Sequence, residues 1–496
     1  MMIASAAASS DSADARLSSS PDASRTRMAS RASRLTDWGT VPCDPAGMVV
    51  VRAALGASVA WFAFETLAST SLVADYIAPP MHLTYLGFDW VRPWPGVGMH
   101  VHFLVMLAAA VGVAVGLFYR ASALLMLLTF AHAFLIERSI YNNHYYLQLL
   151  LALLANVIPL HCQWSVDAWR CPAIFRPSLP RWTLSLLRFQ VGIVYFFGGI
   201  AKLNSDWLRG QPMRMWLKAQ TDYPVIGSLF TEEWVVQLFV WSGLLIDLLA
   251  VPGLLWRRTR VAMFAVLTLF HLLNSTLFTI GVFPWLMIAL TTIFLTPDWP
   301  RRLIRRSVPT SEPRAATKAE WTARRRFGAV LLAIYVLAQL AIPLRHFLSS
   351  GNPSWTEHGQ LFAWRMMLRQ KRSGIRLFVT DPRTGRRGVV DVRAHLTPRQ
   401  VVAMSRDPDL IVQFAHKLAD LLRQHGFPHV EIRADALASL NGRQPQHLID
   451  PNVDLVTVQR SLREYKWVVP LTEEYRHDDW EPTMGSVAAT PLPGAE

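Results

Sequence analysis

Residues 195–210 read YFFGGIAKLNSDWLRG, and the apolar part of this stretch stops at Lys202. The stretch completes a longer apolar run, Leu184–Ala201, which approaches the roughly 20 residues that cross a hydrocarbon layer. A lysine at that depth is either an anchor that extends its ammonium to the lipid headgroups or a catalyst. For catalysis, burial in an apolar wall would disfavour the charged form and let the amine accept a proton. Asp206, one turn further on, would oppose this by stabilising the ammonium.

Further apolar runs of comparable length follow one another along the 496 residues. They predict an all-α membrane bundle of about eight or nine transmembrane helices over residues 39–343, with the lipid bilayer as its partner. The segment Val261–Leu295 is either two spans joined at Asn274-Ser275 or one long broken helix. The other runs are Val49–Leu67, His102–Phe118, Ala121–Ile136, Tyr145–Leu160, Trp234–Leu255 and Phe327–Ile342.

The formal net charge of +14 does not indicate nucleic-acid binding, because the arginines lie in loops between the apolar runs. They cluster before the first run, around residues 257–260 and within residues 301–326. The positive-inside rule places these three sites in the cytoplasm, and alternation along the runs then places everything after Pro343 outside. Residues 1–38 lack an apolar stretch and are predicted to be a disordered cytoplasmic tail, and residues 476–496 a second disordered tail.

Composition changes after Pro343, where charge rises and short alternating segments replace the long apolar runs. The segments 375–379 and 387–392 flank the turn DPRTG at residues 381–385, which is a hairpin signal. Thr397–Gln400 predicts a helix start and Asp407–His425 an amphipathic helix. We therefore expect a small extracytoplasmic α+β domain over residues 344–475.

Two pairs of polar residues at or within the apolar runs are candidate site residues. His144 follows Asn143 at the outer mouth of the fourth run, where a histidine either caps the helix or serves as a hydrogen-bond donor beside an anionic substrate. His271 and Asn274 interrupt another run, and such groups either face a site or form hydrogen bonds between helices. By the predicted topology, His144 and Lys202 face the same side of the membrane and can share a site.

The segment Trp355–Met367 is rich in aromatic residues and methionine just beyond the last apolar run. It is either an interfacial belt or the lining for a flat, apolar ligand, with Trp364, Met366 and Met367 as its candidates. The sequence contains no GxGxxG, P-loop or HExxH pattern and no paired-cysteine metal motif, so nucleotide and metal chemistry have no support.

Several ordered blocks of this sequence resemble the vitamin K-dependent gamma-glutamyl carboxylase family over roughly residues 36–472. They include NNHYY at 142–146, GIAKLNSDW at 199–207, FHLLNS at 270–275, WRMM at 364–367 and LNGR at 440–443. The resemblance implies an integral membrane enzyme, a carboxy-lyase and epoxidase. Such an enzyme oxidises vitamin K hydroquinone with O2 to the epoxide and couples this to CO2 addition at protein or peptide glutamates.

The resemblance also implies roles for individual residues. Lys202 would be the base that deprotonates the hydroquinone, whose hydroxyl pKa of about 10 is that of a phenol. His144 would stabilise an anion that forms later. Asn143, the neighbour of His144, would contact the hydroquinone oxygen. The remaining substrate-binding candidates are His271, Asn274, Trp364, Met366 and Met367.

The composition, rich in Arg and Ala, is typical of a bacterial member, so we expect the inner membrane as its location and menaquinol as an alternative quinol. The chain stops soon after the segment 467–471, whereas vertebrate members of the family continue through a long lumenal region. Bacterial relatives need not have a glutamate-rich protein substrate, so the resemblance implies quinol oxygenation more directly than carboxylation. The competing hypothesis is a non-enzymatic membrane protein, either a transporter or a scaffold bearing the related horizontally transferred transmembrane (HTTM) domain.

Overall fold

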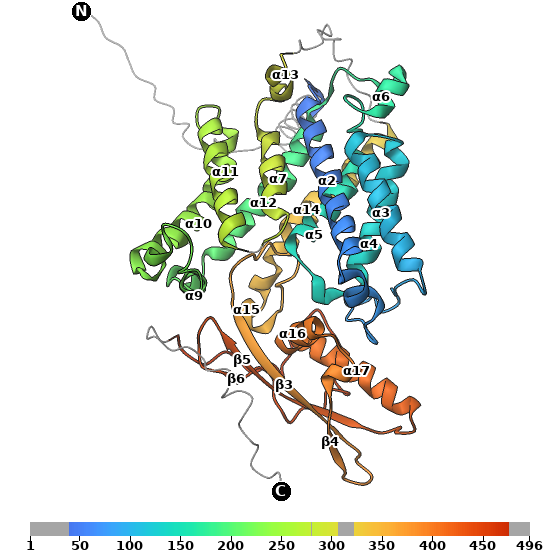
Figure 1. Ribbon diagram of the computed structural model, residues 1–496, viewed down its shortest axis with the longest axis vertical. Coiled ribbons are helices and arrows are strands. Elements are labelled where there is room, and N and C mark those ends of the chain that lie inside the picture. The colour runs from blue at the N-terminus through green and yellow to red at the C-terminus, as the bar shows by residue number, and fades with distance from the viewer. Residues whose placement is uncertain (1–38, 279, 306–321, 476–496) are drawn as a thin grey trace, which may run out of the picture.

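The computed structural model describes residues 39–278, 280–305 and 322–475. Seven of its helices are long and apolar enough to cross a membrane, and they stand side by side as a bundle (Figure 1). This confirms the predicted helical membrane fold, whereas the two tails predicted to be disordered lie outside the described residues. The seven helices are α2 (Ala46–Ala68), α3 (Gly98–Val115), α4 (Tyr119–Ile136), α7 (Arg181–Lys202), α10 (Glu233–Leu255), α11 (Arg260–Leu277) and α14 (Ala323–Leu344).

Two further apolar helices of the bundle are shorter than the sequence predicts. Helix α5 (Asn143–Val157) has 15 residues, and α12 (Phe283–Thr291) has nine before it tightens into η5 (Thr292–Phe294). At 1.5 Å per residue α5 is about 22 Å long, which is less than the hydrocarbon thickness of about 30 Å. More than half of the α5 residues are buried against neighbouring helices, which shield it from lipid. The eight or nine predicted spans are thus seven long helices and two short ones.

The polar pair Asn274-Ser275 lies inside α11 and does not join two helices. Ser275 donates its hydroxyl hydrogen to the Leu272 carbonyl at 2.7 Å, which satisfies it within the helix. The chain leaves α11 after Leu277 and enters α12 only at Phe283. Two helices do occupy this region, but the junction predicted at Asn274-Ser275 was wrong by several residues.

The two ends of the bundle carry different elements. Helices α6 (Val166–Arg170) and α13 (Trp299–Leu303) lie at one end, together with the turn between α10 and α11 (Figure 1). Helices α8 (Ser205–Leu208) and α9 (Met213–Lys218) follow the opposite end of α7, on the side of the C-terminal domain. The described arginines of the two basic loops, at 257–260 and 301–305, therefore lie away from that domain.

The C-terminal domain is a four-stranded antiparallel sheet with two helices packed on it (Figure 1). The strand order is β4-β3-β5-β6, and the β3–β4 pairing of Phe378 with Val389 confirms the predicted hairpin. Thr397 and Gln400 form a capping box at the predicted helix start. The elements are β3 (Lys371–Thr380), β4 (Arg387–Val389), β5 (Glu431–Leu440), β6 (Gln446–His447), α16 (Pro398–Arg406) and α17 (Pro408–Gln424).

The remaining elements are short. A two-residue pairing joins β1 (Pro42–Cys43) to β2 (Leu179–Pro180) at the base of α2 and α7. The short helical turns are η1 (Leu72–Ile77), η2 (Arg138–Ile140), η3 (Pro172–Ile174), η4 (Gly227–Thr231), η6 (Arg345–Leu348), α15 (Pro353–Thr356) and η7 (Val392–Ala394).

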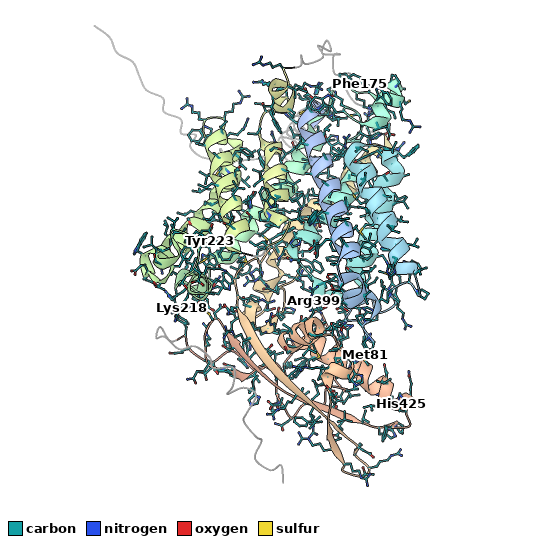
Figure 2. All side chains as sticks on the ribbon, viewed as in Figure 1. Met81, Phe175, Lys218, Tyr223, Arg399 and His425 are labelled. Carbon is teal, nitrogen blue, oxygen red and sulfur yellow. The ribbon has the colours of Figure 1, made fainter. Side chains whose placement is uncertain are left out.

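Ion pairs join the C-terminal domain to the bundle. Arg138 contacts both Asp407 and Asp409 at the start of α17. Arg399 of α16 lies 2.9 Å from Asp75, and Figure 2 places Arg399 at this junction, far from Phe175 at the opposite end. The domain is therefore fixed against one end of the helices.

Candidate functional site

A cavity of about 640 Å³ lies within the bundle at the end that faces the C-terminal domain. Its walls come from α5, α7, α10, α11 and α12, and the chain segment 360–369 closes it from the domain side. Most of the lining side chains are apolar or aromatic, as in sites that hold small organic ligands. Seven of the predicted site residues line it: Asn143, His144, Lys202, His271, Asn274, Met366 and Met367.

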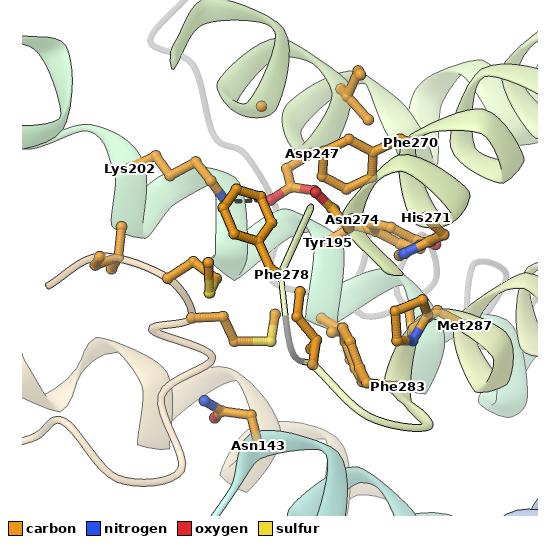
Figure 3. Close-up of a pocket in the computed structure, with 18 of the residues that line it drawn as sticks. Asn143, Tyr195, Lys202, Asp247, Phe270, His271, Asn274, Phe278, Phe283 and Met287 are labelled. Atoms are coloured by element: carbon orange, nitrogen blue, oxygen red, sulfur yellow. Dashed lines mark hydrogen bonds and ion pairs between the residues drawn. The ribbon is translucent and has the colours of Figure 1, made fainter. Parts of the chain in front are cut away.

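Lys202 ends α7 and points across the cavity at α10 (Figure 3). Its Nζ lies 2.6 Å from Oδ2 of Asp247 and 3.3 Å from the Gly198 carbonyl oxygen. The side chains of Lys202 and Asp247 are 7% and 8% exposed, so the pair is buried. The ring of Trp207 lies 5.3 Å from the same nitrogen. The amine is thus held in the cavity and does not extend to the lipid headgroups.

Asp206 does not contribute the carboxylate that Lys202 meets, contrary to the expectation from their spacing. It turns towards the C-terminal domain, where Oδ1 accepts from Arg443 at 2.6 Å and Oδ2 from Asn441 at 2.8 Å. Helix α7 ends at Lys202 and α8 begins at Ser205, so the two residues do not share one helical face. Asp206 therefore anchors the domain.

Two glycines let α7 approach α10 closely enough for the ion pair. A Cβ on Gly199 would lie 2.7 Å from Leu248 Cδ2 and 3.1 Å from the Leu248 nitrogen. A Cβ on Gly198 would lie 3.1 Å from Oδ2 of Asp247. Glycine at both positions removes these clashes, and the carboxylate reaches the lysine one turn further along.

His271 belongs to a hydrogen-bonded row on the opposite wall. Tyr195 Oη lies 2.8 Å from His271 Nε2 and 2.8 Å from Thr291 Oγ1. The row joins α7, α11 and α12, and Figure 3 shows the Tyr195 and His271 side chains adjacent. It holds the His271 ring in place, and Asn274 lies one turn further along α11.

His144 lies in the first turn of α5 with its side chain buried. Its ring packs against Tyr145 and Phe283, with ring centroids 4.4 Å and 6.1 Å away. No described residue forms a hydrogen bond with the imidazole, which leaves its nitrogens available to a ligand in the cavity. The positive end of the α5 dipole favours an anion at the same position. Asn143 accepts a hydrogen bond from Tyr141 at 3.1 Å.

The segment 360–369, which closes the cavity, has an unusual backbone conformation. Phe362, Trp364 and Met367 all have left-handed φ values, of 60°, 55° and 53°. Such values cost energy for residues with side chains and persist only where the surroundings fix them. Tyr141 does so by accepting a hydrogen bond from the Phe362 nitrogen at 2.7 Å, and Arg345 contacts the Leu361 carbonyl.

Of the three ligand contacts predicted in this segment, two line the cavity and one does not. Met366 and Met367 line the cavity. Trp364 is fully buried behind the wall, where its ring lies 5.0 Å from that of Tyr146. In this position Trp364 packs against other side chains, and its direct contact with a ligand stays a prediction.

Sequence reasoning missed Asp247, Tyr195 and Thr291 as members of the site. Asp247 is the one acid within the apolar run 234–255, and an ionisable residue inside a span is a site candidate by default. That signal was present. Tyr195 and Thr291 lack such a signal, because their hydrogen bonds depend on how α7 packs against α12.

Comparison with protein families gives two matches in succession along the chain. Residues 41–299, more than half of the chain, match the HTTM domain, and residues 324–474 match the lumenal domain of vitamin K-dependent gamma-carboxylase. No solved structure matches the chain. Among the described residues no cluster of His, Cys, Asp or Glu could hold a metal ion. Both halves of the fold and the order of the two matches agree with the resemblance seen in the sequence. The chain is a carboxylase-like integral membrane protein that belongs to the vitamin K-dependent gamma-glutamyl carboxylase family.

Proposed function

We propose that this protein oxidises a membrane-borne hydroquinone of the vitamin K or menaquinol type with O2 to the epoxide and couples the oxidation to addition of CO2 to glutamate side chains. The observation that carries the proposal is the buried Lys202 in an apolar cavity beside His144 and His271. The family supports the use of vitamin K hydroquinone and of glutamate-containing substrates.

The cavity fits a fused-ring quinol in size and in chemistry. A volume of about 640 Å³ lies in the usual range for small-molecule sites, roughly 300–1,000 Å³. Phe270, Phe283 and the two methionines Met366 and Met367 offer flat and polarisable contacts to an aromatic ring. Leu269 of α11 lines the cavity and is 68% exposed, so the cavity wall reaches the surface that this helix would present to lipid.

Four polar residues divide the work in this proposal. Lys202 removes the first proton from a hydroquinone hydroxyl, and this step prepares the substrate for O2. His144 and Asn143 donate hydrogen bonds to the anionic oxygen that develops, and the α5 dipole adds to their effect. His271 orients the substrate from the opposite wall, since Tyr195 fixes its ring. Oxidation by O2 supplies the energy and the strong base that carboxylation requires.

The proposed location is the bacterial inner membrane, with the C-terminal domain outside the cytoplasm. The described arginines at 257–260 and 301–305 lie at the end of the bundle opposite that domain, and the positive-inside rule places such an end in the cytoplasm. The cavity then opens near the outer side, where glutamate-containing proteins would reach it.

The direct test adds air to purified protein that has been incubated anaerobically with reduced menaquinone or vitamin K. Chromatography should detect the epoxide with wild-type protein and with Lys466→Ala, a variant of an exposed lysine in the C-terminal domain. Lys202→Ala should form none above background. Wild-type protein that forms no epoxide from either quinol contradicts the proposal and favours a transporter or scaffold.

A further inference from the structure

The ion pair between Lys202 and Asp247 raises a question about how Lys202 accepts a proton. The two side chains meet at 2.6 Å inside the cavity, and both are more than nine-tenths buried. Among the described residues that line the cavity, Asp247 is the one acid. Its described hydrogen-bond partner is Lys202. The lysine therefore has a dedicated carboxylate.

A lysine that keeps all three protons cannot be a base. The ammonium has three donors and no acceptor, so it has no lone pair for a substrate proton. In water, an aspartate at this distance would hold Lys202 in that form. The catalytic interpretation of Lys202 therefore requires a place where its third proton can go.

The buried environment provides such a place. Removing two opposite charges from water costs about as much as their attraction returns, so a buried pair gains little from staying charge-separated. At 2.6 Å, a single hydrogen bond joins Nζ to Oδ2, and its proton can move from one atom to the other. A proton can then lie on Asp247 Oδ2 while Lys202 is an amine.

We propose that Lys202 and Asp247 form one proton-accepting unit, in which Asp247 is the positioning residue that takes the third proton of Lys202 and so makes the amine available to the substrate. This inference rests on the proposed quinol oxidation and names a residue that the family assignment does not. Of these two residues, only Lys202 touches the substrate.

The proton balance of the step is closed within the pair. Before the step, the amine and the carboxylate share one proton and the pair has no net charge. One O–H bond of the hydroquinone breaks, one N–H bond forms at Lys202 Nζ, and the shared proton stays on Asp247. The pair then carries one positive charge beside a substrate with one negative charge, and no other acid or base takes part.

The surroundings hold the pair in one arrangement. The Gly198 carbonyl oxygen receives a second hydrogen bond from Nζ at 3.3 Å, and the missing side chain of Gly198 leaves room for Oδ2. On the α10 side, a Cβ on Gly243 would lie 3.9 Å from Lys202 Cε, so the lysine stem packs directly on that helix. The amine can therefore turn towards the cavity without losing Asp247.

The first test compares Asp247→Asn with Asp247→Glu. Asparagine keeps an oxygen that accepts a hydrogen bond but cannot take a proton, so kcat for epoxide formation should fall by about 10²–10³ with KM changed little. Glutamate should recover part of kcat, because it restores the acid. Asp298→Asn, which removes an acid paired with Arg302 at the far end of the bundle, is the matched control. Wild-type kcat in Asp247→Asn would overturn the proposal.

The second test uses small amines supplied from solution. An amine that restores epoxide formation to Lys202→Ala would occupy the place of Nζ and would need Asp247 in the same way. The double variant Lys202→Ala/Asp247→Asn should therefore gain at least about tenfold less from the amine, since it lacks the acid–base partner. If the amine restores epoxide formation equally in the single and the double variant, Asp247 takes no proton and has only a structural role, which would overturn the proposal.

A third measurement examines the pair independently of activity. Thermal unfolding in detergent should show that Lys202→Met and Asp247→Leu each lower Tm, and that the double variant lowers it less than the sum. If the Tm shifts are additive and wild-type protein forms epoxide, the proposed Lys202–Asp247 unit is contradicted while the proposed quinol oxidation is not. Wild-type protein without epoxide formation would instead contradict the proposed function, even where the shifts are coupled.

Discussion

Lys202 is where the two interpretations of the sequence, lipid anchor and base, separate most clearly. An anchor needs its nitrogen at the headgroups, whereas the Nζ of Lys202 lies against Asp247 with the side chain 7% exposed. The ion pair also changes what a substitution does. From the sequence alone, Lys202→Ala would be expected to remove only a costly polar group. In the structure, the same substitution also leaves the buried Asp247 without its partner.

We therefore expect Lys202→Ala to lose both activity and stability. Epoxide formation should fall to background, and the free energy of unfolding should drop by about 3–5 kcal/mol, the usual cost of breaking a buried pair. Quinol oxidation and thermal unfolding of the same preparation measure the two effects. Wild-type epoxide formation in this variant would restore the anchoring interpretation.

His144 should act later than Lys202 and should respond differently to replacement. His144→Ala removes a hydrogen bond to a developing anion, so the rate should fall by about 10²–10³ with a smaller change in substrate affinity. Small amines that rescue Lys202→Ala should not rescue His144→Ala, because a diffusible base does not replace a donor. His425→Ala, an exposed histidine at the far end of α17 (Figure 2), is the control. If small amines rescue Lys202→Ala and His144→Ala equally, the roles proposed for Lys202 and His144 would have to be exchanged.

The sequence pointed to those cavity-lining residues that stand out chemically. Lys202 and His144 are polar groups at the ends of apolar runs, and the cavity brings them together as the topology predicts. Asp247 carries the same signal and was missed because Asp206 offered a nearer carboxylate in the sequence. Tyr195 was unpredictable as a partner of His271, because an apolar helix containing a tyrosine does not indicate what its hydroxyl meets.

Among the elements, the contact between α7 and α10 determines whether the site forms. Gly199 faces Leu248 with no room for a Cβ, whereas a Cβ on Gly328 of α14 would meet nothing within 4 Å. We expect Gly199→Val to cost about 1–3 kcal/mol through overpacking and to lower epoxide formation by separating Lys202 from Asp247. Gly328→Val is the matched control and should leave both unchanged. Thermal unfolding and the quinol assay distinguish the outcomes, and equal stability of the two variants would contradict this account.

Helix positions were predictable from the apolar runs, but their ends were not. The run Val261–Leu295 was ambiguous because Asn274 and Ser275 are both polar, and the helix continues through them since a serine hydroxyl can bond the preceding turn. The β3–β4 hairpin was predictable from its turn residues. The full length of β5 was not, because Ala434, Ala436 and Ala438 belong to a residue type that is depleted in strands.

At the scale of the whole molecule, the direction in which the chain crosses the membrane can be measured directly. An alkaline phosphatase fused after Leu471 should be active, because the positive-inside rule places the C-terminal domain outside. The same reporter fused after Arg258, in the turn between α10 and α11, should be inactive, and a fluorescent protein fused at that position should be bright. A bright fluorescent fusion after Leu471 with no phosphatase activity would reverse both the topology and the side on which the cavity opens.

Asp206 and Arg443 connect the turn that follows Lys202 to the C-terminal domain, and their contact should make stability depend on pH. Burial alone would raise the pKa of Asp206, but the hydrogen bonds and charge of Arg443 outweigh it, and the pKa lies below its usual value. A carboxyl with a lowered pKa in the folded state contributes stability above its unfolded pKa of about 3.9 and loses it as pH falls towards the folded value.

We therefore expect Asp206→Asn to lower Tm by a constant amount between pH 5 and pH 8, and the difference from wild type to shrink below about pH 4. Near neutral pH the loss should correspond to about 3–5 kcal/mol, because the variant leaves the buried Arg443 without its carboxylate. Asp420→Asn, an exposed acid paired with Arg423, should change Tm little at any pH. Thermal unfolding across this pH range measures both variants. A difference for Asp206→Asn that grows on acidification would mean that the carboxyl is protonated in the folded protein, and the domain would then be held mainly by Arg138 and its two aspartates.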